Sequence, residues 1–146
     1  MVKSKIFLDS SLLISATLSS TGGSFYILTS PKLNELIDLY INEYVLEEST
    51  RVIKTKFKNR HGIVSNFFLL LGVSNLTILP NPPRKDVAAL SKVINMDDAP
   101  ILASALEHCT YLLTLDKDFL GGQTIDYADR NNLFIMSPKD FILLWS

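Results

Sequence analysis

The sequence predicts an α/β protein, a three-layer α/β/α sandwich with a central parallel sheet of four or five strands. Short apolar runs typical of buried strands alternate along the chain with longer segments of helical periodicity, which is the pattern of a parallel sheet covered on both faces. Asp9 and Asp116 directly follow two of these runs, where the carboxyl edge of such a sheet is expected. With 146 residues, of which 47% are apolar, the chain is expected to form a single domain, 1–146.

Each element is justified by its local pattern, in chain order. Runs of branched and aromatic apolar residues are expected to form strands at 5–8, 36–41, 111–115 and 133–136. Apolar residues spaced by three and four positions indicate helices at 11–19, 24–30, 42–55, 61–72, 86–94, 97–108 and 137–144. The proline-rich stretch 80–84 is expected to join two of these helices.

Composition excludes several classes of protein. The formal net charge of −1 provides no general basic field for nucleic acid, so contact with RNA requires a local patch. The single cysteine, Cys109, excludes an internal disulfide and a multi-cysteine zinc site, and we expect it to pack in the core. No signal region precedes the first strand, and the most apolar stretch, 63–73, is far shorter than the roughly 20 residues of a membrane span. We therefore expect a cytoplasmic protein with no membrane partner.

Two acidic residues fall on or beside the apolar faces of predicted helices. Asp98 lies on the apolar stripe of helix 97–108, where a carboxylate must be paired, bound to a ligand or capping the helix. The capping interpretation stays open, because Asp before Ala-Pro is a common helix start. Glu48 borders the buried arc of helix 42–55 whereas Glu47 points away from it. Glu48 is therefore the candidate site residue, with a surface ion pair as the alternative.

Further acidic residues follow the predicted strands. Asp9 and Asp116 would emerge together at the carboxyl edge of a parallel sheet, and Asp118 could approach the same point after a turn. Thr114 is placed so that its hydroxyl orients Asp116. Each signal alone has a structural alternative, since Asp residues commonly form turns and helix caps. Carboxylates that converge in one cleft repel one another and require a divalent cation, which suits phosphodiester hydrolysis.

The order of these acids along the chain is more specific than any one of them. An Asp follows the first strand, a Glu and an Asp lie on two later helices, and Thr-x-Asp-x-Asp follows a strand. This arrangement resembles the PIN-domain family of metal-dependent ribonucleases, and in particular its VapC-like branch of toxins from toxin–antitoxin pairs. The matching segments are 6–16, 43–48, 98–105 and 111–119, and the resemblance extends over residues 5–141.

The resemblance implies a function, partners and a set of site residues. The chain would hydrolyse RNA phosphodiester bonds with Mg²⁺ or Mn²⁺, form a homodimer and bind an antitoxin protein. The implied catalytic residues are Asp9, Glu48, Asp98 and Asp116, the implied metal ligands are Asp9, Asp98 and Asp116, and the implied auxiliary residues are Asp118, Thr114 and Ser10.

The first motif departs from the family. Where the family usually has Asp-Thr-Asn, this chain has Asp9, Ser10 and Ser11, so the hydroxyl is kept and the amide is lost. A catalytically weak PIN-like module that binds RNA or protein is therefore the alternative. A phosphohydrolase with an aspartyl nucleophile is disfavoured, because Phe119 rather than a hydroxyl-bearing residue follows Asp118.

The densest basic run consists of Lys54, Lys56, Lys58 and Arg60. If this run binds RNA phosphates, binding should be sensitive to salt. Cations also favour a helix carboxyl end, so solvated charge is the alternative. Residues 67–71 are apolar on all sides of a helix, which indicates core burial, or a face for a second copy or for an antitoxin helix.

Overall fold

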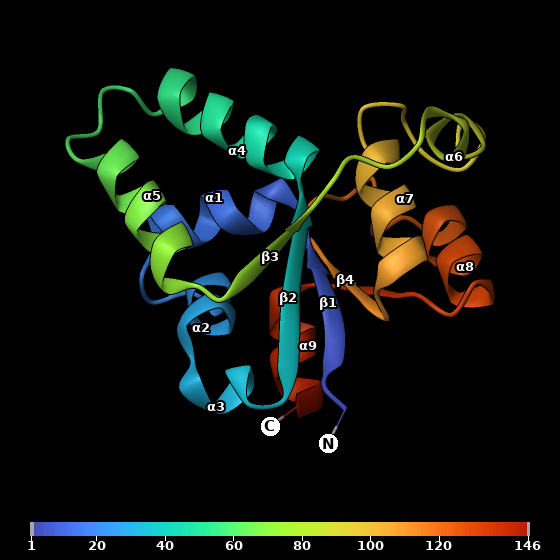
Figure 1. Cartoon of the computed structure of the whole chain (residues 1–146), viewed down its shortest axis with the longest axis horizontal. Coiled ribbons are helices and arrows are strands. Elements are labelled where there is room, and N and C mark those ends of the chain that lie inside the picture. Colours follow the sequence, from blue (N-terminus) through green and yellow to red (C-terminus); the bar gives the residue numbers. More distant parts are fainter. Residues whose placement is uncertain (1, 146) are drawn as a thin grey trace.

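A five-stranded parallel sheet forms the centre of the molecule in the computed structural model, which describes residues 2–145 (Figure 1). The strands are β1 (Ser4–Leu8), β2 (Ile37–Asn42), β3 (Leu76–Leu79), β4 (Tyr111–Leu113) and β5 (Phe134–Met136). They follow the order β3-β2-β1-β4-β5, and every neighbouring pair is parallel. The predicted α/β class with a central parallel sheet is therefore confirmed.

Helices cover both faces of the sheet. They are α1 (Ser10–Leu18), α2 (Gly23–Thr29), α3 (Pro31–Asn34), α4 (Glu43–Lys56), α5 (Ile63–Val73), α6 (Arg84–Ala88), α7 (Ala99–His108), α8 (Gly122–Arg130) and α9 (Pro138–Trp145). In Figure 1, α1, α2, α4 and α5 lie on one side of the sheet and α6, α7 and α8 on the other. Within residues 2–145, no helix is long and apolar enough to cross a membrane.

β1 lies in the middle of the sheet and of the core. Ile6, Phe7 and Leu8 are fully buried because helices pack on both faces, which is why this strand is a continuous apolar run. The chain builds β2 and β3 on one side of β1, and β4 and β5 on the other. The carboxyl end of β1 is therefore the point where the strand order reverses, and open α/β sheets bind ligands at this point.

The pattern does not predict β3 or α8. β3 is an edge strand whose two middle residues, Thr77 and Ile78, are exposed, so it lacks the continuous apolar run of a buried strand. α8 follows Gly121, and its buried residues are the small Thr124 and Ala128. Its larger core-facing residues, Ile125 and Tyr127, are only partly buried, so few large apolar residues mark this short helix in the sequence.

Two predicted element boundaries and one predicted connection are wrong. The helix expected at 86–94 is α6, which begins at Arg84 and ends at Ala88. Beyond it, backbone N–H groups bond mainly three positions back, and the buried Leu90 and Ile94 hold these turns against the core. The strand expected at 111–115 ends at Leu113. The stretch 80–84 links β3 to α6 and does not join two helices.

Candidate functional site

Asp9 is the first residue beyond β1 and lies at the carboxyl edge of the sheet. It is 3% exposed. Its Oδ1 accepts the backbone N–H of Ser10 at 2.8 Å, at the amino end of α1. Its Oδ2 accepts the hydroxyl groups of Ser11 and Thr114, each at 2.7 Å. One side chain therefore caps a helix and faces the end of β4.

The loop after β4 is tied to Asp9 by Thr114. The Thr114 Oγ1 donates to Asp9 and accepts the backbone N–H of Asp116 at 2.9 Å. Asp116 Oδ1 in turn accepts the backbone N–H of Asp118 at 2.9 Å. These bonds fix the path of the loop so that both of its acidic residues lie beside the carboxyl end of β1.

Ser11 also connects α1 to this loop. Its hydroxyl donates to Asp9 Oδ2 and accepts the backbone N–H of Leu115 at 3.0 Å. It lies 3.5 Å from Thr114 Oγ1. Ser11 thus helps to hold Asp9, although it lacks the amide group expected at this position.

Asp98 lies at the amino end of α7 and faces the same loop. It occupies the N-cap position, but its side chain makes no capping hydrogen bond, so capping does not account for it. Carboxylate oxygens of Asp98, Asp116 and Asp118 lie within 4.8 Å of one another. In the part of the chain that the structure describes, no other His, Cys, Asp or Glu side chain joins this group, Asp9 included.

Glu48 reaches the site from α4. Its Oε1 accepts a hydrogen bond from Ser10 Oγ, which lies 3.4 Å from Asp9 Oδ1. Glu48 is half-buried whereas Glu47 is exposed, in line with their positions on the helix. Ser10 therefore links Glu48 to Asp9, and the acidic residue of α4 borders the group without belonging to it.

Two asparagines that the sequence analysis does not single out position these acids. Asn42, the last residue of β2, is fully buried and caps α4. Its Nδ2 donates to Pro100 O at 3.1 Å and to Ser104 Oγ at 2.8 Å, so one amide joins α4 to α7. Asn95 Nδ2 donates to Asp118 Oδ2 at 3.2 Å. The signal for Asn42 was present in the sequence, because it is a polar residue directly after an apolar strand.

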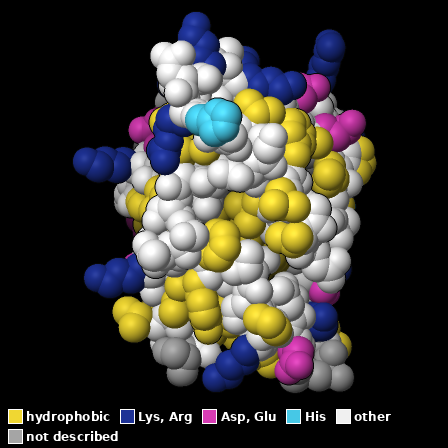
Figure 2. Space-filling model, turned by 90° about the vertical axis from the view of Figure 1, so that its left-hand side faces the viewer, with side chains coloured by type: hydrophobic (Ala, Val, Ile, Leu, Met, Phe, Trp, Pro, Cys, Tyr) yellow, Lys and Arg dark blue, Asp and Glu magenta, His cyan; other side chains and the backbone are white. Residues whose placement is uncertain are grey.

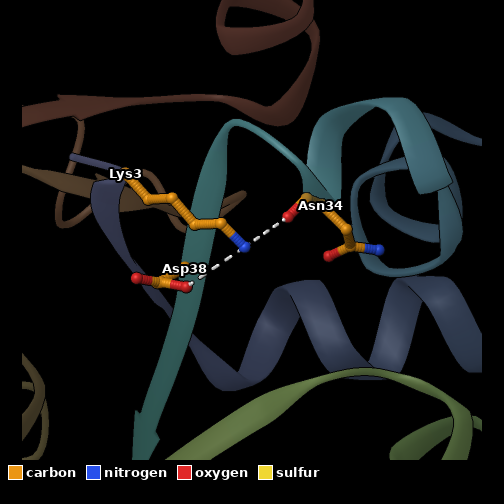
Figure 3. Close-up of polar contacts among 3 residues, drawn as sticks. All are labelled: Lys3, Asn34 and Asp38. Carbon is orange, nitrogen blue, oxygen red and sulfur yellow. Dashed lines mark hydrogen bonds and ion pairs between the residues drawn. The ribbon is translucent and has the colours of Figure 1, made fainter. Parts of the chain in front are cut away.

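No cationic side chain of residues 2–145 forms an ion pair with these carboxylates. Among residues 2–145, the single ion pair joins Lys3 to Asp38 at 3.9 Å, and it lies at the amino edge of the sheet (Figure 3). Burial, with added repulsion from the neighbouring acids, raises the pKa of Asp98 to about 7. Burial also raises the pKa of Asp9, although its hydrogen-bond donors act in the opposite direction.

The donor set fits a hard divalent cation. The candidate ligand atoms are all carboxylate oxygens, which Mg²⁺ and Mn²⁺ prefer over nitrogen and sulfur. A double positive charge would relieve the repulsion that raises the pKa of Asp98. Asp98, Asp116 and Asp118 are the residues whose separation fits one such ion.

The predicted basic run lies farther from the acidic group. Lys54 and Lys56 are in the last turns of α4, Lys58 and Arg60 follow in the next loop, and all four are exposed. The rise of an α-helix places Lys54 about 9 Å along the axis from Glu48. This run can therefore contact a nucleic acid only at a distance from the carboxylates.

The cysteine and the two histidines, the residue types that commonly act in covalent catalysis, lie away from the acidic group. Cys109 and His108 are at the end of α7 opposite to Asp98, and His61 is exposed in the loop before α5. Burial raises the pKa of the Cys109 thiol to about 12, so the thiol stays protonated at neutral pH. Cys109 packs against the core, as predicted.

Comparisons with known proteins identify the architecture. A family model described as PIN domain matches residues 6–121. VapBC2 from Rickettsia felis, solved bound to a promoter DNA fragment, is 19% identical, with 91% of this chain and 98% of that chain covered and a TM-score of 0.63. PAE2754 from Pyrobaculum aerophilum is 12% identical, with coverages of 96% and 93% and a TM-score of 0.65. FitAcB from Neisseria gonorrhoeae is 18% identical, with coverages of 92% and 98% and a TM-score of 0.56. No curated protein sequence matches the chain.

Proposed function

The chain belongs to the PIN domain family, and we propose that it is a divalent-metal-dependent endoribonuclease, the toxin of a type II toxin–antitoxin pair acting in the cytoplasm. The observation that carries the proposal is the approach of Asp98, Asp116 and Asp118 within 4.8 Å of one another. Within residues 2–145 these acids have no cationic partner. Clustering like charges in a partly buried site costs free energy, so stability does not account for this group.

Asp98, Asp116 and Asp118 would hold the Mg²⁺ or Mn²⁺ ion. When bound, the ion would lower the pKa of a water molecule and stabilise negative charge on the scissile phosphate. Asp9 would position these ligands indirectly. It accepts a hydrogen bond from Thr114, and Thr114 in turn accepts the backbone N–H of Asp116. Positioning of this kind is commonly required for metal affinity.

Glu48 is the acidic residue available to accept a proton from the attacking water. Its charge lies close enough to Asp98 to help raise the pKa of that group, yet it is not part of the proposed ligand set. The contact with Ser10 fixes its carboxylate. Hydrolysis by water needs no covalent intermediate, which agrees with the remote positions of Cys109 and both histidines.

The direct test is RNA cleavage with Mn²⁺ or Mg²⁺ by wild type, Asp98→Asn and Asp9→Asn. The matched control is Asp126→Asn, which removes an exposed carboxylate of α8. We expect wild type and Asp126→Asn to cleave, and both other variants and EDTA-treated wild type to leave the RNA intact. Equal cleavage by wild type and Asp98→Asn contradicts the proposal. Binding of RNA without turnover by wild type supports the inert module instead.

A groove on another face of the molecule supports the proposed antitoxin partner. Figure 2 shows hydrophobic side chains gathered on the face that carries α5. A cavity of about 340 Å³ opens between α1, α2 and α5. Its lining residues are Ala16, Thr17, Ser20, Phe25, Thr29, Asn66, Leu69, Leu70 and Val73. Leu69 and Val73 are 67% and 65% exposed, which is unusual for large apolar residues and typical of a partner-binding face. We assign this groove to an apolar helix of the antitoxin.

The partner assignment is tested with the product of a small reading frame adjacent to the gene. We expect Leu69→Glu to abolish co-elution of the two proteins, and Ile78→Glu, which alters an exposed apolar residue of β3, to retain it. If Leu69→Glu instead converts a homodimer to a monomer and keeps the complex, the groove belongs to the dimer interface.

A further inference from the structure

A second pocket lies beside the acidic group, along α4. It has a volume of about 210 Å³ and is lined by Tyr44, Glu47, Glu48 and Arg51. Tyr44, Glu48 and Arg51 are separated by four and three residues, so they lie on one face of the helix. Because Glu48 contacts Ser10 at the carboxyl edge, this face starts at the candidate metal site and extends away from it.

Tyr44 is fixed at this edge by bonds at both of its ends. Its hydroxyl donates to the backbone oxygen of Asp97 at 2.6 Å, and its backbone N–H donates to Asn81 Oδ1 at 2.8 Å. The side chain is half-buried, so part of the ring is accessible. An aromatic ring held in this way binds a nucleobase without losing much side-chain entropy.

Arg51 carries the positive charge nearest to the acids on this face. It is exposed, and within the described residues it forms neither an ion pair nor a side-chain hydrogen bond. It lies about 4.5 Å along the helix axis from Glu48, half the axial separation of Lys54. Its five N–H donors match the geometry of a phosphate group. The pKa of Tyr44 is raised by burial and by the charges of Glu48 and Asp98 and lowered by the charge of Arg51, so the phenol lies near both the acids and the cation.

We propose that Tyr44 and Arg51 form a subsite that holds single-stranded RNA next to the cleaved bond, with a base on the Tyr44 ring and a backbone phosphate on the Arg51 guanidinium. This inference rests on the proposed ribonuclease function and deepens it. The carboxylates repel the RNA backbone, so a cation close to them is needed to hold the strand in place. A paired base cannot reach the face of an aromatic ring, and the subsite therefore selects unpaired RNA.

The experiment compares Arg51→Gln, Tyr44→Leu and Tyr44→Phe with wild type on a short single-stranded RNA. Lys32→Gln, which removes an exposed cation from α3 at the amino edge, is the matched control. We expect Arg51→Gln and Tyr44→Leu to raise KM about tenfold with kcat nearly unchanged, because one charged hydrogen bond or one stacked base is worth about that factor. Tyr44→Phe keeps the ring and should change KM by less than about threefold. Arg51→Gln should also reduce the salt slope of RNA binding by about one.

Three outcomes distinguish this inference from the proposed function. Mn²⁺ affinity and thermal stability should match wild type in Arg51→Gln, which shows that the fold and the metal site are intact. If wild type cleaves RNA while Arg51→Gln has an unchanged KM and salt slope, the subsite is wrong and the nuclease proposal stands. If wild type neither binds nor cleaves RNA with either metal, both are overturned. If the salt slope of RNA binding falls in Lys54→Gln but not in Arg51→Gln, the RNA binds along the basic run, and the subsite is contradicted.

Discussion

The two edges of the same sheet treat charge in opposite ways. At the amino edge, Lys3 Nζ donates to the backbone oxygen of Asn34 at 2.9 Å and lies 3.9 Å from Asp38 Oδ1, so charge is neutralised within the chain (Figure 3). At the carboxyl edge, Asp98 and its acidic neighbours have no ion-pair partner among residues 2–145. Hydroxyl, amide and backbone groups donate the hydrogen bonds that hold these acidic residues.

The difference shows what each edge is built for. The amino-edge pair is exposed and solvated, and such pairs contribute little to stability. At the carboxyl edge, burial and repulsion raise the pKa of Asp98 to about 7, and a bound cation would relieve the free-energy cost of the ionised carboxylate. Uncompensated charge at the point where strand order reverses is therefore the physical signature of the site, more than the number of acidic residues.

The largest expected difference between the edges appears when one carboxylate is removed from each in turn. Asp98→Asn should lower RNA cleavage by at least about 100-fold, because it removes a proposed metal ligand. The metal-free variant should also melt a few degrees higher, since repulsion is relieved. Asp38→Asn should leave cleavage within about twofold of wild type, because its pair is exposed. Cleavage rates and thermal melts with EDTA check both. Similar losses in both variants would remove the distinction between the edges.

The next effect tests the hydroxyl that holds the loop. Thr114→Val should lower cleavage by about 10–100-fold, because Asp9 loses a donor and the backbone N–H of Asp116 loses its acceptor. It should also destabilise the protein by about 1–3 kcal/mol, the cost of a buried polar group left unsatisfied. Thr77→Val on the exposed edge strand is the control for the loss of a hydroxyl. A urea titration and a cleavage assay give the two values, and unchanged Mn²⁺ affinity in Thr114→Val would contradict the positioning role.

Much of this edge could be predicted from the sequence. The apolar runs before Asp9 and Asp116 gave the two strands, and the helical pattern separated the half-buried Glu48 from the exposed Glu47. The prediction worked because buried parallel strands and core-facing helix stripes impose strong apolar patterns. The fold class follows from the same patterns.

The remaining features depend on tertiary contacts that leave little local pattern. The close group consists of Asp98, Asp116 and Asp118, so it includes Asp118, which the resemblance gives as auxiliary, and leaves out Asp9. That distinction depends on Thr114, which turns the loop by bonding to residues 105 positions away in one direction and two in the other. Asn42 acts in the same way across α4 and α7. Spacing in the sequence does not specify such bonds.

A smaller effect is expected in how the free energy of unfolding depends on pH. Asp98 has an ordinary pKa of 3.8 and a folded pKa of about 7, so between these values the metal-free folded state holds a proton that the unfolded state has lost. The contribution of Asp98 to the free energy of unfolding is therefore greatest below about pH 4. It falls as the pH rises toward 7 and stays low above pH 7. Mn²⁺ competes with the same proton, so its affinity should fall by up to about tenfold per pH unit below 7. Urea titrations of metal-free protein at pH 5 and pH 8 should show this slope in wild type and a weaker one in Asp98→Asn, and identical slopes would contradict the assignment.

The smallest effect is expected at the amino edge. Lys3→Met removes the cation of a pair whose side chains are 37% and 42% exposed, so water solvates Asp38 once its partner is gone. The free energy of unfolding should fall by about 0–1 kcal/mol, and 0.5 M salt should reduce even that difference because exposed pairs are screened. RNA cleavage and Mn²⁺ affinity should not change, since the sheet separates Lys3 from the acidic group. A loss of cleavage in Lys3→Met, at unchanged stability, would mean that the two edges are coupled, and charge at the carboxyl edge could then no longer be interpreted on its own.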